Sequence, residues 1–219
     1  VVFSPQHLSL VKEGPSNRRN FIDGSLCQSK PAYAKLLMHY NRTLSQRNML
    51  LKEITKHPEL KDTLEIWDEK LVKFDSSFLK EGQTEIETCF FEKLKSSRKS
   101  DFMVGYTTVG PHRDDISFYI NEISARSFGS QGQQRSVALA LKLAESKVME
   151  SITGDKPVMF LDDVMSELDE NRQDYILNHL KDQQVFITCC DPNTIHQLKQ
   201  GALFKIHQGE LIEQMILKS

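Results

Sequence analysis

The segment from Lys156 to Asp169 (Lys-Pro-Val-Met-Phe-Leu-Asp-Asp-Val-Met-Ser-Glu-Leu-Asp) constrains the fold more than any other part of the chain. Its apolar residues 158–161 are followed at once by Asp162 and Asp163. A short apolar run is typical of a buried strand in a parallel sheet, and open α/β sheets bind ligands at the carboxyl ends of such strands. The segment therefore predicts a buried strand that opens into a phosphate site, then a turn and a helix. A buried strand with a merely solvated acidic end is the alternative.

A second segment, residues 128–136 (Phe-Gly-Ser-Gln-Gly-Gln-Gln-Arg-Ser), precedes an Ala- and Leu-rich run. Ser130 is a favourable N-cap, and the run predicts a helix from Gln131 to about Ile152. The start of such a helix presents unpaired N–H groups and the positive end of the helix dipole, so it suits an anion such as a γ-phosphate. A capped core helix without a ligand is the alternative. A cap, however, needs neither Gly132 nor the doubled glutamine.

An apolar strand that ends in Asp-Asp has the form of a Walker B motif, with which P-loop ATPases hold magnesium. Together with the glutamine-rich segment, it resembles the RecF family of bacterial recombination proteins, whose members have ABC-type ATPase heads. Three further segments carry the resemblance: residues 1–19, residues 46–52 (Gln-Arg-Asn-Met-Leu-Leu-Lys) and residues 105–115 (Gly-Tyr-Thr-Thr-Val-Gly-Pro-His-Arg-Asp-Asp). The similarity covers almost the whole chain.

The resemblance implies an α/β fold, namely part of an ABC-type P-loop ATPase head with an inserted helical lid. Residues 1–25 would end the first ATPase lobe, residues 26–100 would form the lid, and residues 101–219 would form the lobe with the signature motif, Walker B and D-loop. The implied function is ATP-dependent DNA binding in recombinational repair and replication-fork restart. The protein would dimerise on ATP to clamp DNA and help to load recombinase at single-strand gaps. The implied partners are DNA without sequence preference, a second copy of the chain, and RecR-like and RecO-like mediator proteins.

The same resemblance assigns catalytic roles, with ATP and Mg²⁺ as cofactors. Asp162 would orient Mg²⁺ through coordinated water. Asp163 stands where ABC-type ATPases place the glutamate that positions the attacking water. Because aspartate is one methylene shorter than glutamate, we expect slow hydrolysis, suited to a timed clamp.

Further site residues follow from the family pattern. The signature residues would meet the nucleotide held by the other subunit, which makes dimerisation part of the chemistry; they are Ser130, Gln131, Gly132, Gln133, Gln134 and Arg135. Ser166 and Asp169 would belong to the D-loop. Gln6 is the candidate for the Q-loop, although the family more often shows an acidic pair there. Asp191 is the candidate for the switch position.

The phosphate loop of such an ATPase is missing from this sequence. None of the 10 glycines is followed by lysine, so the pattern G-x-x-x-x-G-K-[ST] does not occur. We therefore expect the phosphate-loop half to lie N-terminal to Val1. The complete protein is then expected to be a slow DNA-dependent ATPase, and this chain alone to be inactive.

The composition limits the other classes of function. With 39% hydrophobic and 26% charged residues, the 219-residue chain is expected to form one or two domains. It has no apolar run near the ~18 residues of a membrane span and no secretory leader, so a cytoplasmic protein is predicted. The 4 cysteines lack C-x-x-C spacing, which disfavours zinc.

The net charge of −2 provides no overall basic field, so contact with DNA would depend on local patches. The candidates are Arg18, Arg19, Lys35, Arg42, Arg47 and Lys52. Accessible cations suffice to contact phosphates, and no basic stretch interleaved with aromatic residues suggests base stacking. Sequence-independent binding is therefore expected.

Hydrophobic periodicity predicts the remaining elements. Two lid helices, from Pro31 to Ile54 and from Leu60 to Phe78, would pair across His57-Pro58. The stretch between Phe74 and Glu87 is short for the family, so either the lid is reduced or residues are absent from it. The ATPase lobe would contain a hairpin of residues 115–120 and 123–128, a helix 169–180, a strand 184–188, a short helix from Asn193 and a closing hairpin around Gln208-Gly209. Alternating strands and helices imply a largely parallel sheet.

Two other classes of function share these features. A transporter or cohesin-like ATPase head would carry the same two motifs, but the first needs membrane coupling and the second needs long heptad arms. A non-catalytic interaction module would explain the missing phosphate loop. A Gly-Lys-Thr/Ser loop encoded upstream of Val1 would decide between these alternatives.

Overall fold

The computed structural model describes the backbone of residues 1–76, 83–165, 168–180, 183–190 and 200–217. The chain divides into two compact units. The sheet unit consists of Val1–Lys12 with the described part of Phe118–Ser219, and the helical unit is Glu13–Ser117. The chain thus passes between the units after Lys12 and after Ser117, whereas the sequence placed boundaries at residues 25 and 100.

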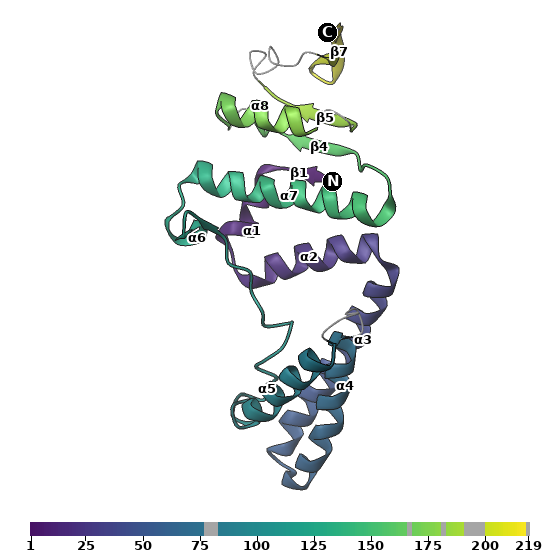
Figure 1. Cartoon of the computed structure of the whole chain (residues 1–219), viewed down its shortest axis with the longest axis vertical. Helices are drawn as coiled ribbons and strands as arrows, with labels where there is room; N and C mark the ends of the chain where they lie inside the picture. The colour runs from purple at the N-terminus through teal and green to yellow at the C-terminus, as the bar shows by residue number, and fades with distance from the viewer. Residues whose placement is uncertain (77–82, 166–167, 181–182, 191–199, 218–219) are drawn as a thin grey trace. The chain divides into compact units, whose positions relative to one another are not determined.

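The sheet unit contains a parallel three-stranded sheet (Figure 1). Its strands are β1 (Val2–Phe3), β4 (Met159–Asp162) and β5 (Val185–Thr188), in the order β1-β4-β5. Residue Phe160 of β4 pairs with Val2 on one side and with Phe186 on the other. The predicted parallel sheet is confirmed, and the acidic strand is its central member.

The two faces of this sheet differ. On one face, Phe3, Met159 and Leu161 are buried in a core shared with helices α7 (Gln131–Thr153) and α8 (Glu170–His179). The opposite face carries Val2, Phe160 and Phe186, which are 44–49% exposed. The rings of Phe160 and Phe186 stack there at 4.9 Å between centroids. Alternate residues of a strand share a face, so Asp162 and Thr188 lie on this same open face.

Local capping explains why both helices begin where they do. Ser130 and Gln133 form a capping box at the start of α7, and Gly154 ends this helix at φ 79°. Asp169 caps α8 by accepting a hydrogen bond from the backbone N–H of Arg172 at 3.1 Å. The helices predicted at 131–152 and 169–180 are confirmed within one or two residues.

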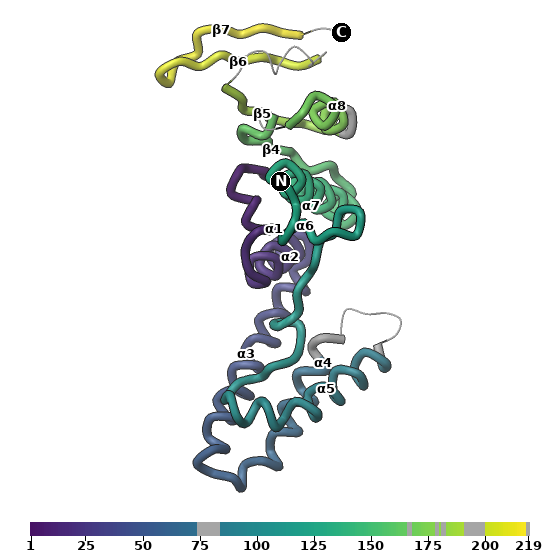
Figure 2. The backbone as a smooth tube through the Cα atoms, turned by 90° about the vertical axis from the view of Figure 1, so that its left-hand side faces the viewer, coloured from purple at the N-terminus to yellow at the C-terminus, as the bar shows by residue number. Residues whose placement is uncertain are grey.

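Two antiparallel hairpins complete the described part of the sheet unit. β2 (Tyr119–Ile120) and β3 (Ile123–Ser124) turn through Asn121 and Glu122, both with positive φ. The predicted second strand, 123–128, is wrong beyond Ser124, because Ser124 caps the short helix α6 (Ala125–Phe128). The predicted closing hairpin is confirmed as β6 (Gly201–His207) and β7 (Glu210–Leu217), seen side-on in Figure 2. The predicted helix from Asn193 lies outside the described residues.

The helical unit contains α2 (Pro15–Ser29), α3 (Pro31–Ile54), α4 (Leu64–Ser76) and α5 (Gln83–Val104). The prediction of α3 is confirmed to the residue. The second predicted helix starts four residues late, because Pro58–Thr63 form a 3-10 turn first. The helices α2 and α5 were not predicted. Tyr40, Leu71 and Leu94 form the centre of the core between α3, α4 and α5.

Two short segments link β1 to the helical unit. A 3-10 turn, η1 (Pro5–Leu8), follows β1 directly, and α1 (Ser9–Lys12) follows η1. Leu10 and Val11 of α1 are buried.

Candidate functional site

The acidic end of β4 is fixed by its neighbour β5. Thr188 is the register partner of Asp162, and its hydroxyl donates a hydrogen bond of 2.6 Å to Asp162 Oδ1. Because Asp162 is exposed, its carboxylate is held in one orientation while it still faces solvent. The sequence did not single out Thr188, although a polar residue at the carboxyl end of the adjacent parallel strand was the available signal.

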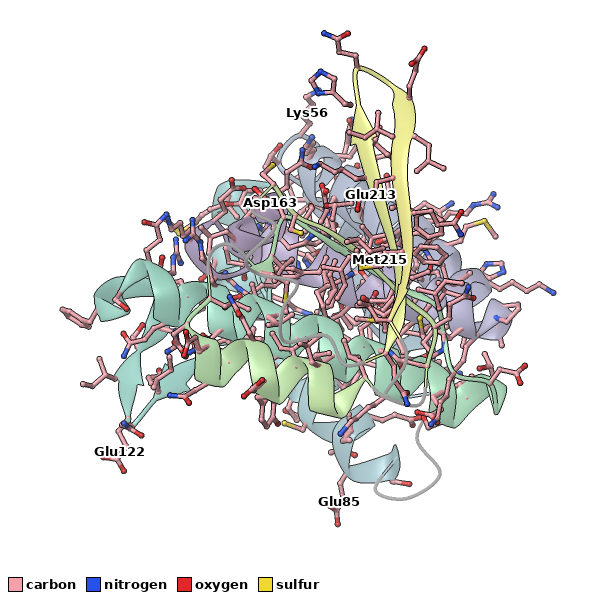
Figure 3. The ribbon with its side chains drawn as sticks, turned by 90° about the horizontal axis from the view of Figure 1, so that it is seen from above. Lys56, Glu85, Glu122, Asp163, Glu213 and Met215 are labelled. Atoms are coloured by element: carbon pink, nitrogen blue, oxygen red, sulfur yellow. The ribbon has the colours of Figure 1, made fainter. Side chains whose placement is uncertain are left out.

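Asp163 begins the turn after β4 in a strained backbone conformation. Its φ is +51°, a left-handed value that costs a non-glycine residue roughly 1–2 kcal/mol. The backbone N–H of Asp163 donates to the carbonyl of Thr188 at 3.2 Å and to its hydroxyl at 3.1 Å. The tie to β5 holds the turn, so the Asp163 side chain leaves the sheet at a defined place (labelled in Figure 3).

A small cavity brings three predicted segments together. Asp162, Asp163 and Arg135 line it, together with Pro5 and Leu8 of η1 and apolar core residues. Its volume of about 70 Å³ is far below the ~300 Å³ at which small-molecule pockets begin. The cavity can therefore hold water or an ion beside the carboxylates but not a nucleotide by itself.

The residues present fit Mg²⁺ of the kind that arrives with a nucleotide. Among the described residues, no three His, Cys, Asp or Glu side chains gather to form a complete metal site. Mg²⁺ is commonly held by one or two carboxylates, several waters and the phosphates of a substrate. A single oriented carboxylate such as Asp162 matches that donor set.

The signature segment, residues 130–135, starts α7 as an exposed helix terminus. Ser130 Oγ accepts from the N–H of Gln133 at 3.3 Å, and Gln133 Oε1 accepts from the N–H of Ser130 at 2.8 Å. The N–H groups of Gln131 and Gly132 donate to no acceptor in the part of the chain that the structure describes. Two donors at the positive end of a 23-residue helix thus remain available to an anion.

Gly129 sets the approach to this helix. A Cβ built on Gly129 would stand 2.4 Å from the carbonyl oxygen of Ala125, so no larger residue fits without moving the backbone. The close approach turns the chain directly from α6 into the Ser130 cap.

Two predicted signature residues contact other parts of the sheet unit. Gln134 is buried, and its side-chain amide donates to the carbonyls of Ala125 (3.1 Å) and Arg126 (3.4 Å). Arg135 lines the cavity beside Asp162. The prediction that Gln134 meets a nucleotide on another subunit is therefore wrong, because its buried side chain anchors the preceding loop. Arg135 is half-buried, and its contact with a nucleotide stays a prediction.

The turn between β4 and α8 is held by α8 itself. The side chain of Gln173 is buried and donates to the carbonyls of Met165 (2.7 Å) and Leu168 (3.0 Å). Asp169 caps the helix, as described above. Sequence reasoning missed Gln173, because a single glutamine on a helix gives no local signal. Ser166 and Asp191, predicted for the D-loop and the switch, lie outside the described residues.

Gln6 lies on η1 and is exposed. Its neighbour Pro5 lines the cavity, whereas Gln6 does not. Its assignment to a Q-loop remains a prediction.

Arg47 is placed very differently from the prediction that it contacts DNA. Its side chain is fully buried and donates to Asp68 (2.6 Å), Asp101 (2.8 Å) and Thr107 (2.7 Å). Both carboxylates are also fully buried. Arg47 therefore joins α3, α4 and α5 to the loop after α5 and cannot reach a phosphate. This prediction is wrong.

Arg18 also forms an internal ion pair, with Asp115. It is 3% exposed, and Nε and Nη2 donate to the two carboxylate oxygens of Asp115 at 2.6 and 2.9 Å. Arg19 is half-buried and donates to the carbonyl of Asp114 at 2.8 Å. Arg42, Lys35 and Lys52 are exposed. The prediction of DNA contact is thus wrong for Arg18 and stays a prediction for the exposed cations.

The loop after α5 also holds a half-buried histidine. His112 Nδ1 lies 2.8 Å from the hydroxyl of Tyr40, and Nε2 lies 3.2 Å from the carbonyl of Thr107. This arrangement suits the neutral ring, with Nε2–H donating to the carbonyl and Nδ1 accepting from the phenol. Burial lowers the pKa of His112 most, nearby Arg113 and Arg19 lower it further, and the Thr107 carbonyl partly opposes them.

A parallel sheet whose central strand ends in the oriented Asp162 followed by Asp163, next to a helix capped by Ser130 and Gln133, defines the class of this protein: it is part of an ABC-type P-loop ATPase head. Comparison with known proteins then gives the family. The chain is 41% identical over 241 residues to the DNA replication and repair protein RecF of Lachnoclostridium phytofermentans. It is 42% identical over 243 residues to that of Agathobacter rectalis. These alignments cover 95% and 96% of the chain and 67% of each relative.

The chain belongs to the RecF family of DNA replication and repair proteins. Two solved structures of the recombination mediator protein RecF in the RecFOR pathway, with ATPrS and with ATP, match at TM-scores of 0.76 and 0.77. Each is 35% identical in sequence to this chain. The alignments cover 96% and 98% of this chain, and 66% and 67% of the two solved chains. No family model matches the chain.

Two further observations follow from these comparisons and from the helices. The alignment with the first relative spans 241 positions, more than the 219 residues of the chain, so that relative has residues within the aligned region that this chain lacks. In the part of the chain that the structure describes, no helix has both the length and the apolarity to cross a membrane.

Proposed function

We propose that this chain forms the signature and magnesium-binding part of an ATPase head that dimerises on ATP and clamps DNA. The complete protein would act in recombinational repair and replication-fork restart, where it helps to load recombinase at single-strand gaps. Its phosphate loop is supplied by a segment that is not part of this chain. The cofactors are ATP and Mg²⁺.

The observation that carries this proposal is the oriented carboxylate of Asp162 at the carboxyl end of the central strand. Thr188 fixes this carboxylate, and Asp163 follows in a strained turn whose side chain lines the same cavity. Bound Mg²⁺ would supply charge neutralisation of the nucleotide phosphates. Asp162 would hold that ion through water, and Asp163 would position the attacking water.

The signature helix start completes the site from a second subunit. The free N–H groups of Gln131 and Gly132 point out of an exposed terminus, away from the buried contacts of Gln134. A γ-phosphate bound to another subunit's phosphate loop is the ligand that such a terminus suits. Dimerisation then requires ATP, because the nucleotide lies in the interface.

DNA contact belongs to the exposed cations of the helical unit. Lys35 and Arg42 lie seven residues, or two helical turns, apart on α3, so they share one exposed face. Cations on one face can follow a phosphate backbone without reading its sequence. The proposed partners are therefore DNA, a second copy of the protein, and RecR-like and RecO-like mediators.

The substitution Asp162→Asn in the complete protein tests the proposal. An amide of equal size keeps the packing and can still accept the Thr188 hydrogen bond, but it loses the charge that organises the ion. We expect ATP turnover with DNA and Mg²⁺ to fall to the level seen without Mg²⁺. The matched control is Asp174→Asn, an exposed aspartate on α8, which should leave turnover unchanged. Turnover of Asp162→Asn equal to that of the wild type would contradict the magnesium role.

A further inference from the structure

The guanidinium of Arg172 connects two parts of the proposed nucleotide interface within one subunit. Arg172 lies in the first turn of α8, where Nη1 is 3.2 Å from Oδ2 of Asp169. The same Nη1 would be 3.4 Å from a Cβ built on Gly132. One side chain thus contacts Asp169 and lies beside Gly132 at the start of the signature helix.

Hydrogen bonds hold the backbone at the start of α8, from which Arg172 extends. The side chain of the next residue, Gln173, donates buried hydrogen bonds to the carbonyls of Met165 and Leu168. Asp169 is held as well, because its Oδ1 caps the N–H of Arg172. The Arg172 side chain thus extends from a helix start that is tied by hydrogen bonds to Met165 and Leu168.

The residue type at position 132 agrees with this contact. A methyl group at position 132 would lie 3.4 Å from Nη1, which is ordinary van der Waals contact, so the guanidinium lies directly beside the helix start. With glycine at this position, the helix start stays open to a ligand next to Arg172.

We propose that Arg172 is a positioning residue that couples the acidic turn to the signature, so that both meet the partner-bound nucleotide in one geometry. This inference rests on the proposed function, in which the signature and Asp169 face a second subunit. A change at the Walker B end then reaches the signature through Asp169 and Arg172.

Fold stabilisation does not account for the pair. Arg172 and Asp169 are 43% and 54% exposed in their side chains. An exposed ion pair at this i,i+3 spacing contributes at most about 1 kcal/mol to stability. If Arg172 only stabilised the fold, replacing it would have a small effect on the melting temperature, on ATP affinity and on the dimer. If Arg172 is a positioning residue, the replacement strongly weakens the ATP-dependent dimer and leaves the other two properties unchanged.

The test compares four variants of the complete protein: Arg172→Ala, Arg172→Lys, Asp169→Asn and the double variant Asp169→Asn/Arg172→Ala. Asparagine keeps the helix cap and removes only the charge. Three properties are measured: ATP affinity of the monomer, melting temperature, and the ATP-dependent dimer by light scattering. Arg126→Ala, which removes an exposed cation from the neighbouring helix α6, is the matched control.

We expect Arg172→Ala to weaken the ATP-dependent dimer roughly tenfold to a hundredfold, as for a misplaced binding group. Monomer affinity for ATP and the melting temperature should stay near the wild-type values. Arg172→Lys should restore part of the dimer, and the double variant should be no weaker than Arg172→Ala, because both changes break one coupling. Arg126→Ala should behave like the wild type.

Two results overturn the inference. The first is a normal ATP-dependent dimer of Arg172→Ala under conditions where Ser130→Arg blocks dimerisation. This result would refute the role of Arg172 and leave the proposed function intact. The second is strict additivity of the Asp169 and Arg172 changes. If Ser130→Arg itself dimerises normally with ATP, the proposed function is refuted, and the role of Arg172 is refuted with it.

Discussion

Replacing Arg47 by methionine should strongly destabilise the helical unit. Methionine has a similar length and no charge, so the substitution leaves the carboxylates of Asp68 and Asp101 buried and without their shared cation. Breaking a buried ion pair in this way costs about 3–5 kcal/mol. Asp68 keeps Arg98 at 2.7 Å, and Asp101 keeps the hydroxyl of Thr108 at 2.6 Å. The remaining partners place the expected loss at the lower end, about 3 kcal/mol.

Urea unfolding followed by tryptophan fluorescence measures this loss. Trp67, the single tryptophan of the sequence, lies on α4, so its emission reports on the helical unit. With a slope of about 1–3 kcal/mol per molar urea, a loss of 3 kcal/mol lowers the midpoint by roughly 1–3 M. Arg42→Met is the matched control on the same helix, and as an exposed site it should change stability by less than about 0.5 kcal/mol.

The result that would refute this reasoning is a midpoint of Arg47→Met equal to that of Arg42→Met. In that case the buried carboxylates would be compensated without Arg47, and its assignment to the interior would lose its energetic basis.

Two further predictions concern Asp163, in the turn after β4, and the half-buried His112. In the complete protein, Asp163→Glu should raise the rate of ATP hydrolysis, because the longer side chain reaches the attacking water better. Because residue 163 has a φ of +51°, the same substitution should lower the melting temperature slightly. An unchanged or lower rate of hydrolysis would contradict the role of Asp163. Burial lowers the pKa of His112, so this imidazole binds a proton more readily in the unfolded chain than in the folded one. The free energy of unfolding reported by Trp67 should therefore be highest above pH ~6.5 and fall as the pH drops below that value. His112→Gln should flatten that fall, and an equal slope in both proteins would contradict the assignment.

Motifs that act locally could be predicted from the sequence. The apolar run before Asp162 and the cap at Ser130 carry their structural meaning within a few residues, and both elements lie where the sequence placed them. The parallel sheet followed from the alternation of these elements. The resemblance to the family added the roles of the residues.

Features that depend on packing could not be predicted in the same way. Arg47 was taken for a surface cation, yet it lies on the helical stripe of Tyr40, Leu44, Leu51 and Ile54, at spacings of three and four residues. An arginine on an apolar stripe is the signal that could have revealed its burial. Gln134 gave no such signal, because its partners are carbonyl groups brought close only by the turn at Gly129. Helix α2 was missed because its apolar residues are few and do not fall on one face.

The central claim, that the signature helix closes on a nucleotide held by another subunit, is tested most directly by light scattering of the complete protein with ATP and Mg²⁺. Ser130→Arg places a bulky cation at the exposed start of α7 and also removes the cap; Ser130→Ala removes the cap alone, at about 1 kcal/mol. The account predicts ATP binding by each monomer in both variants, an ATP-dependent dimer for Ser130→Ala, and none for Ser130→Arg. An undiminished dimer signal for Ser130→Arg would contradict it, because the signature would then lie outside the nucleotide interface.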